Sequence, residues 1–161
     1  MIFSEDKYRF MHAALQEATK AFEENEIPVG AIVTYQNKII GRGYNQVEKL
    51  KDPTAHAEMI AITSAANYLG DWRLNECSLF VTLEPCIMCS GAILNSRISE
   101  IYFGCFDTKS GACGSRYNLI EENNLNHKIK IYSGLLAEES SNLLKEFFNK
   151  IRVKQSSNNF D

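Results

Sequence analysis

Two short stretches constrain the fold of this chain more than any others, because residues far apart in sequence must meet at one point. His56 and Glu58 form a His-x-Glu pair, and Cys86 and Cys89 lie in a Pro-Cys-x-x-Cys run. Imidazole and thiolate are preferred zinc ligands; structural sites close with four protein ligands, whereas catalytic sites keep three and leave a position for water. With three well-spaced ligands, the sequence predicts a catalytic zinc site with Glu58 beside it.

The spacing of these residues predicts that the ligands lie at the starts of two helices. Pro85 is typical of a helix start, and a separation of three puts Cys86 and Cys89 on one helix face, where the dipole stabilises thiolates. His56 and Glu58 would point to different faces within a helix, but at its N-terminus both can flank one point. We therefore expect the metal at the facing N-termini of two helices.

Each half of the pattern also has ordinary interpretations. A Cys-x-x-Cys pair can be a redox pair, half of a structural zinc site, or two core thiols. A redox pair needs no His-x-Glu upstream, and a structural site needs a fourth ligand. Cys77 and Cys105 lie in apolar runs and are typical core residues, whereas Cys113, in a Gly-rich loop, stays open as a fourth ligand.

Around these motifs the chain alternates helices with strands, which predicts a layered α/β domain. The expected elements are a helix over 4–24, strands over 31–35 and 38–45, a helix capped by Thr54 and ending near Leu69, a strand over 77–83, a helix over 86–95, strands over 98–105 and 127–132, and a helix over 137–153. We expect a single domain over 1–153, followed by a polar, flexible tail over 154–161.

Composition bounds the class of protein. A length of 161 residues suits one domain, and 45% hydrophobic with 23% charged residues is typical of soluble globular proteins. No apolar run is long enough to span a membrane, and the acidic N-terminus lacks signal-peptide features, so we expect a cytoplasmic protein. A net charge of −3 argues against general nucleic-acid binding, so any RNA contact requires a local basic patch.

The ligands and the carboxylate together predict hydrolytic deamination. Zinc makes hydroxide available near neutral pH. Glu58 would take a proton from the attacking water and deliver protons to a ring nitrogen and to the leaving amine. The products are a carbonyl and ammonia, so we expect an amino-substituted nucleobase as substrate.

By these motifs the chain resembles the bacterial tRNA-specific adenosine deaminases, within the cytidine deaminase-like superfamily. The resemblance runs from about Tyr8 to Arg152. The zinc motifs are superfamily-wide, whereas the loop that begins at Asp107, the Asn126-His127 pair and the Phe147-Phe148 pair are more specific to the tRNA enzymes. The resemblance implies an α/β fold with three α/β/α layers and a central, mostly five-stranded mixed sheet.

The resemblance also implies a reaction and its participants. The expected reaction converts the wobble adenosine (position 34) of a tRNA anticodon, in an arginine tRNA, to inosine, by a homodimer with one zinc ion per subunit. His56, Cys86 and Cys89 would bind zinc, and Glu58 would carry protons. The residues expected to line the base pocket or contact RNA are Val29, Asn45, Asp107, Lys109, Asn126, Phe148 and Arg152. The local basic residues late in the chain are Lys128, Lys130, Lys145, Lys150, Arg152 and Lys154.

Two alternatives would use the same zinc site. The first is a deaminase of a free nucleobase or nucleoside such as guanine. The Asp107 loop and Asn126 favour tRNA over that substrate, and His56 stands where many cytidine deaminases have Cys. The second alternative is a zinc-stabilised RNA-binding or interaction module, against which the intact Glu58 argues.

Overall fold

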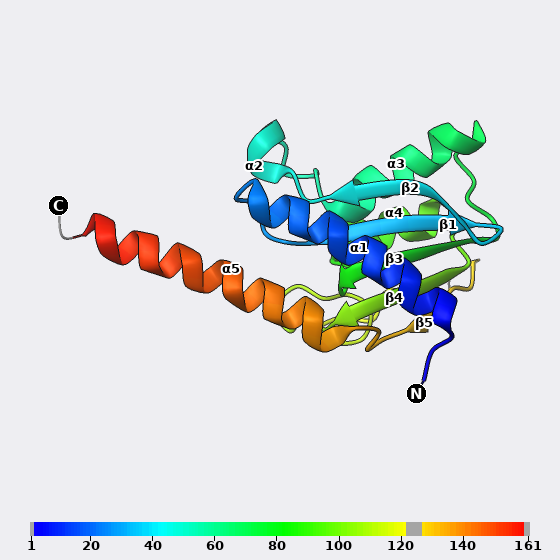
Figure 1. Cartoon of the computed structure of the whole chain (residues 1–161). Coiled ribbons are helices and arrows are strands. Elements are labelled where there is room, and N and C mark those ends of the chain that lie inside the picture. The colour runs from blue at the N-terminus through cyan, green and yellow to red at the C-terminus, as the bar shows by residue number, and fades with distance from the viewer. Residues whose placement is uncertain (1, 122–126, 160–161) are drawn as a thin grey trace.

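A five-stranded mixed sheet lies between helices in the computed structural model, which describes residues 2–121 and 127–159 (Figure 1). The elements are α1 (Glu5–Glu23), β1 (Gly30–Tyr35), β2 (Lys38–Tyr44), α2 (Val47–Leu50), α3 (Ala57–Leu69), β3 (Cys77–Leu83), α4 (Ile87–Asn95), β4 (Glu100–Cys105), β5 (Lys130–Tyr132) and α5 (Ala137–Asn158). The predicted three-layer α/β/α architecture is confirmed.

The order of the strands puts the two sequence motifs at one end of the sheet. The order is β2-β1-β3-β4-β5, with β1 antiparallel to β2 and β3, and with β3, β4 and β5 mutually parallel. Helix α4 makes the crossover between the parallel strands β3 and β4. Clefts in such sheets form beyond the carboxyl ends of parallel strands, and the Pro-Cys-x-x-Cys run follows the carboxyl end of β3.

The strands alternate their side chains between two hydrophobic cores, as the two-residue period of a strand requires. In β3, Leu79 and Val81 pack in the core with α3 and α4, whereas Phe80 packs in the core with α1. Helices α1 and α5 cover one face of the sheet, and α3 and α4 cover the other (Figure 1). The core thus fixes the orientation of the two helices that carry the zinc ligands.

Aromatic rings from three neighbouring strands stack on the α1 side. The rings of Phe80 and Tyr102 lie 4.6 Å apart, and those of Tyr102 and Tyr132 lie 4.7 Å apart, measured between centroids. The Nζ atom of Lys7 in α1 lies 4.9 Å from the Tyr102 centroid, within cation–π range. These contacts hold the start of α1 against the parallel half of the sheet.

Two helix boundaries differ from the sequence-based expectation. The predicted cap at Thr54 is wrong: α3 begins at Ala57 with His56 as its N-cap, because the Thr54 hydroxyl instead donates to Asp52 Oδ1 at 2.7 Å. Helix α5 continues to Asn158 instead of ending at Val153, because residues 154–158 contain neither Gly nor Pro. Its exposed C-terminal part projects past the rest of the molecule (Figure 1).

The last strand is shorter than predicted. It begins at Lys130, and His127 lies before it, where the ring Nε2 is 2.7 Å from the carbonyl oxygen of Ile98. Over residues 2–121 and 127–159, no helix has both the length and the apolar character needed to cross a bilayer.

Close packing of β2 against α3 requires glycine at position 43. A Cβ atom on Gly43 would meet the carbonyl oxygen of Ala57 and would lie 2.7 Å from the amide nitrogen of Ala61. We expect Gly43→Ala to lower the free energy of unfolding by roughly 1–3 kcal/mol, because the helix must shift. Urea denaturation measures the loss. Gly91→Ala, where the new Cβ would meet no atom within 4 Å apart from its chain neighbours and the nearby backbone of its own helix, serves as the control and should change stability by less than about 1 kcal/mol. Equal stability of the two variants would contradict this packing argument.

Candidate active site

The three predicted ligands lie where two helices begin. His56 is the N-cap of α3 and Cys86 is the N-cap of α4, both in extended backbone conformation, and Cys89 lies in the first turn of α4. Because a cap residue lies outside the helical repeat, His56 is free of the restriction that a spacing of two imposes within a helix. The expected meeting of two helix N-termini is confirmed.

The distances among these ligands fit a zinc ion. The Nδ1 atom of His56 lies 3.6 Å from Cys86 Sγ and 3.6 Å from Cys89 Sγ. Tetrahedral zinc with bonds of about 2.1 Å to nitrogen and 2.3 Å to sulfur puts such ligand atoms roughly 3.6 Å apart. Within the described parts of the chain, the group of potential metal ligands contains His56, Cys86 and Cys89, all within 4.8 Å of one another. The donor set and its geometry therefore suit catalytic zinc.

Cys113, left open as a fourth ligand, is not in this group. Its buried Sγ instead lies 3.5 Å from the hydroxyl oxygen of Ser90. Cys77 is fully buried and Cys105 is half-buried, as expected for core residues. The group thus keeps three protein ligands, which is the number found in catalytic sites.

The ligands compete for protons with one another. Hydrogen bonding from the Cys89 thiol, assisted by His56, lowers the pKa of Cys86 to about 4. The same hydrogen bond, together with burial, raises the pKa of Cys89, and the contact with Cys86 raises the pKa of His56. A metal ion replaces such protons when it binds, because its ligands must be deprotonated thiolates and neutral imidazole.

Glu58 lies in the first turn of α3, beside the ligands. Its side chain is only 4% exposed, and burial raises the pKa of its carboxyl group. A raised carboxyl pKa brings the group closer to neutral pH, where a proton carrier can both accept and release a proton. The His-x-Glu spacing thus places a suitable acid–base group next to the metal site.

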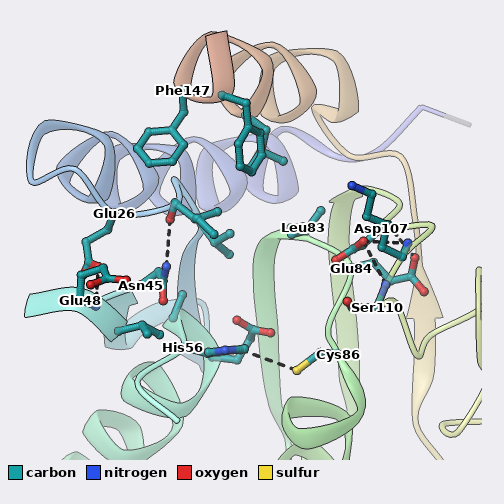
Figure 2. Close-up of a pocket in the computed structure, with 18 of the residues that line it drawn as sticks. Glu26, Asn45, Glu48, His56, Leu83, Glu84, Cys86, Asp107, Ser110 and Phe147 are labelled. Atoms are coloured by element: carbon teal, nitrogen blue, oxygen red, sulfur yellow. Dashed lines mark hydrogen bonds between the residues drawn. The ribbon is translucent and has the colours of Figure 1, made fainter. Parts of the chain in front are cut away.

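A pocket of about 820 Å³ opens onto this group of residues. Figure 2 shows His56 and Cys86 facing each other at its base, Asn45 and Glu48 on one wall, Asp107 on the other, and Phe147 of α5 above. Of the residues predicted to contact substrate, those that line it are Val29, Asn45, Asp107, Lys109 and Phe148. Arg152 lies exposed on α5, next to the lining residue Ile151, and Asn126 lies outside the described residues.

Asn45 presents an unused acceptor in this pocket. Its Nδ2 donates to the carbonyl oxygen of Ile27 at 3.3 Å. Its Oδ1 is buried and has no partner among residues 2–121 and 127–159. An unpaired buried acceptor is costly, so this oxygen is suited to accept a hydrogen bond from a bound ligand.

Sequence reasoning missed several lining residues, among them two buried acids. Glu26 accepts from the backbone N–H groups of Glu48 at 2.7 Å and Lys49 at 3.3 Å, which fixes α2 beside the pocket. Glu84 lines the opposite wall. Each acid directly adjoins an apolar run in the sequence, and that position was the available signal. The other missed lining residues include Ile27, Phe106, Leu144 and Phe147.

Comparison with known proteins agrees with this geometry. Residues 4–105 match the family described as the cytidine and deoxycytidylate deaminase zinc-binding region. The tRNA-specific adenosine deaminase of Aquifex aeolicus (strain VF5) is 49% identical over 146 residues, covering 91% of this chain and 96% of the relative.

Solved structures extend the comparison. A tRNA:A34 deaminase, studied for A-to-I editing at the wobble position, is 41% identical with a TM-score of 0.81, covering 84% of this chain and 98% of that chain. A guanine deaminase from Nitrosomonas europaea has a TM-score of 0.73 at 22% identity, covering 91% of this chain and 86% of that chain, and shares the fold. Because it is 49% identical to a tRNA-specific adenosine deaminase over 91% of its length and matches the zinc-binding deaminase family over residues 4–105, the chain belongs to the tRNA-specific adenosine deaminase family.

Proposed function

We propose that this protein hydrolyses the wobble adenosine (position 34) of a tRNA anticodon, in an arginine tRNA, to inosine. One observation carries the proposal: Glu58 is buried beside three zinc ligands at the base of a pocket large enough for a nucleobase. The 49% identity to a tRNA-specific adenosine deaminase, over 91% of this chain, supports RNA as the substrate in preference to a free base such as guanine.

Three residues would bind zinc, and a fourth would transfer protons. His56, Cys86 and Cys89 would hold zinc, which when bound supplies a Lewis acid that makes hydroxide available near neutral pH. The Glu58 carboxylate accepts a proton from the attacking water. It then donates a proton to the ring nitrogen adjacent to C6, and a second proton transfer converts the amino group into ammonia. Water and adenosine thus give inosine and ammonia.

The pocket walls would bind a base that has left its stack, since the reacting carbon is out of reach in a stacked anticodon. Val29 packs against the base, and Asn45 offers it the unpaired Oδ1. Asp107, Lys109 and Asn126 contact the sugar or the flanking nucleotides. The Oδ1 atom of Asp107 accepts from the N–H groups of Lys109 at 3.1 Å and Ser110 at 3.2 Å, an arrangement that shapes this turn.

Helix α5 would extend the contact towards the anticodon loop. Phe147 packs on Phe22 of α1, with centroids 6.0 Å apart, so that this part of α5 is held above the pocket. Phe148 then offers an aromatic face for stacking. The exposed Arg152, further along α5, contributes a positive charge for phosphate.

We also propose a homodimer that acts in the cytoplasm, where tRNA is available. Ile87 begins α4 directly after a zinc ligand and is 51% exposed, and Phe106 at the pocket is 53% exposed. In a homodimer the partner subunit would cover these two apolar side chains, which removes their apolar surface from water. Sedimentation of the zinc-loaded protein measures its oligomeric state.

The substrate is tested with an anticodon stem-loop RNA that carries adenosine at the wobble position. We expect inosine from this RNA and no product from free adenosine, adenine, guanine or cytidine. Because RNA phosphates release counterions on binding, kcat/KM for the stem-loop should fall roughly tenfold between about 50 and 200 mM salt. A guanosine-wobble stem-loop is the matched control and should give no inosine. Product from free guanine, with none from the stem-loop RNA, would contradict the tRNA assignment but would agree with the zinc-dependent mechanism.

A further inference from the structure

The loop over residues 107–115 forms one wall of the pocket and closes around a single buried side chain, Glu84. Asp107, Thr108, Lys109 and Ser110 of this loop line the pocket. Glu84 follows β3 and is only 2% exposed. Figure 2 shows it beside Asp107 and Ser110, on the same side of the pocket as Cys86.

Both ends of the loop donate hydrogen bonds to the Glu84 carboxylate. The backbone N–H of Asp107 donates to Oε1 at 3.0 Å. At the other end of the loop, the N–H of Cys113 donates to Oε2 at 3.0 Å and that of Ser115 donates to the same oxygen at 3.1 Å. Hydrogen bonds from neutral donors to a charged carboxylate are stronger than those to neutral acceptors, and three of them fix the loop from both sides.

The middle of the loop is fitted to the same side chain. A Cβ atom on Gly111 would meet the Cδ and Oε1 atoms of Glu84 and the Oγ atom of Ser115, so a larger residue at position 111 would displace the carboxylate or the loop. The N–H of Ala112 donates to the carbonyl oxygen of Pro85 at 2.8 Å, which joins the loop to the residue directly before the ligand Cys86. The position of the wall therefore depends on the same segment that positions the ligand.

We infer that Glu84 is a positioning residue that holds the 107–115 loop in its substrate-binding position relative to the zinc ligands. The inference rests on the proposed function and assigns to Glu84 a role in substrate recognition, separate from proton transfer by Glu58. Without its acceptor the loop would lose its fixed position, and substrate would have to order it on binding. The loss should therefore appear in KM, with the reaction of bound substrate largely retained.

Glu84→Gln tests this inference with little change in side-chain shape. A glutamine amide has one acceptor oxygen and one NH₂ donor, so at least one backbone N–H of the loop must face a donor. We expect KM for the stem-loop RNA to rise at least roughly tenfold, since a misplacement of about 1 Å can cost on the order of 100-fold. We expect kcat per bound zinc to stay within about threefold of the wild-type value. This change is small beside the loss on the order of 100-fold that misplaced reacting groups would cause.

Amide hydrogen exchange provides a readout that needs no substrate. In Glu84→Gln, protection should fall over residues 107–115 and remain unchanged in β1 and β3, with zinc content equal to that of the wild type. Gly111→Ala, which puts a methyl group against the Glu84 carboxylate, should reproduce both the exchange and the KM changes.

The matched control is Glu100→Gln, since the Glu100 carboxylate accepts hydrogen bonds from the hydroxyl groups of Ser78 and Tyr102, each at 3.1 Å. Hydroxyls can accept from an amide as well as donate to it, so this variant should keep KM and loop protection. Unchanged loop protection in Glu84→Gln, or a fall in kcat per zinc with KM unchanged, would overturn the inference. Absence of inosine from the wild-type enzyme would instead overturn the proposed function, and the exchange result would still decide whether Glu84 holds the loop.

Discussion

Inosine formation should fall by a factor on the order of 10²–10⁴ when Glu58 is replaced by Gln, while zinc stays bound. The amide keeps the shape of the side chain but cannot take a proton from water. Since His56, Cys86 and Cys89 form the ligand group without Glu58, metal content should remain at one ion per subunit. Single-turnover kinetics on the stem-loop RNA, together with metal analysis of the same sample, measures both quantities.

Glu100→Gln removes a carboxylate outside the pocket and is the control for Glu58→Gln. It should retain wild-type single-turnover rates. If Glu58→Gln kept activity comparable to this control, proton transfer would have to be assigned to another group. If it lost zinc, Glu58 would have a part in metal binding that the ligand distances do not indicate.

Replacing Cys86 with Ala should remove the metal and with it all measurable deamination. The substitution deletes one of three ligands and leaves His56 and Cys89, which lie 3.6 Å apart, with a cavity between the starts of α3 and α4. Because binding energy at a metal site is also folding energy, the thermal midpoint should fall as well. Metal analysis, thermal denaturation and inosine assays check the three effects, and a chelator added to the wild type should lower the midpoint in the same direction.

Cys105→Ala is the matched control, since it removes a half-buried thiol whose Sγ contacts the carbonyl oxygen of Thr82 at 3.7 Å, outside the ligand group. This variant should keep its zinc and its activity. Retention of stoichiometric zinc by Cys86→Ala would show that the metal is held by other groups.

The zinc site could be predicted from sequence because the spacing within each of its two motifs is local and the ligand types of the two motifs complement each other. Pro85 indicates a helix start, and the separation of three puts Cys86 and Cys89 on one face of that helix. Neither inference depends on residues elsewhere in the chain. The strand over Cys77–Leu83 was equally clear, since a short apolar run rich in β-formers is bounded by polar residues. Glu58 could be assigned to the same site as these ligands because His56 and Glu58, two positions apart, can face one point only where a helix begins.

The pocket walls could not be predicted in the same way, because they depend on contacts between distant segments. Nothing near Glu26 in sequence indicates that its carboxylate accepts from backbone groups of Glu48 and Lys49. Thr54 satisfied the local rule for a helix cap, but its hydroxyl contacts Asp52, and His56 takes the cap position. Asn126 remains a prediction, since it lies outside the described residues.

The separate attachment of the metal ligands and the pocket walls has a consequence for how such an enzyme can change. His56 and Cys86 lie at the starts of helices packed on the sheet, whereas the short helix α2 and the 107–115 loop, which form pocket walls, are each held by one buried acid, Glu26 or Glu84. A wall segment can therefore be exchanged for one of another length or composition, provided that it still offers backbone N–H groups to its acid. New substrates could then be selected, by evolution or in the laboratory, without rebuilding the centre that activates water.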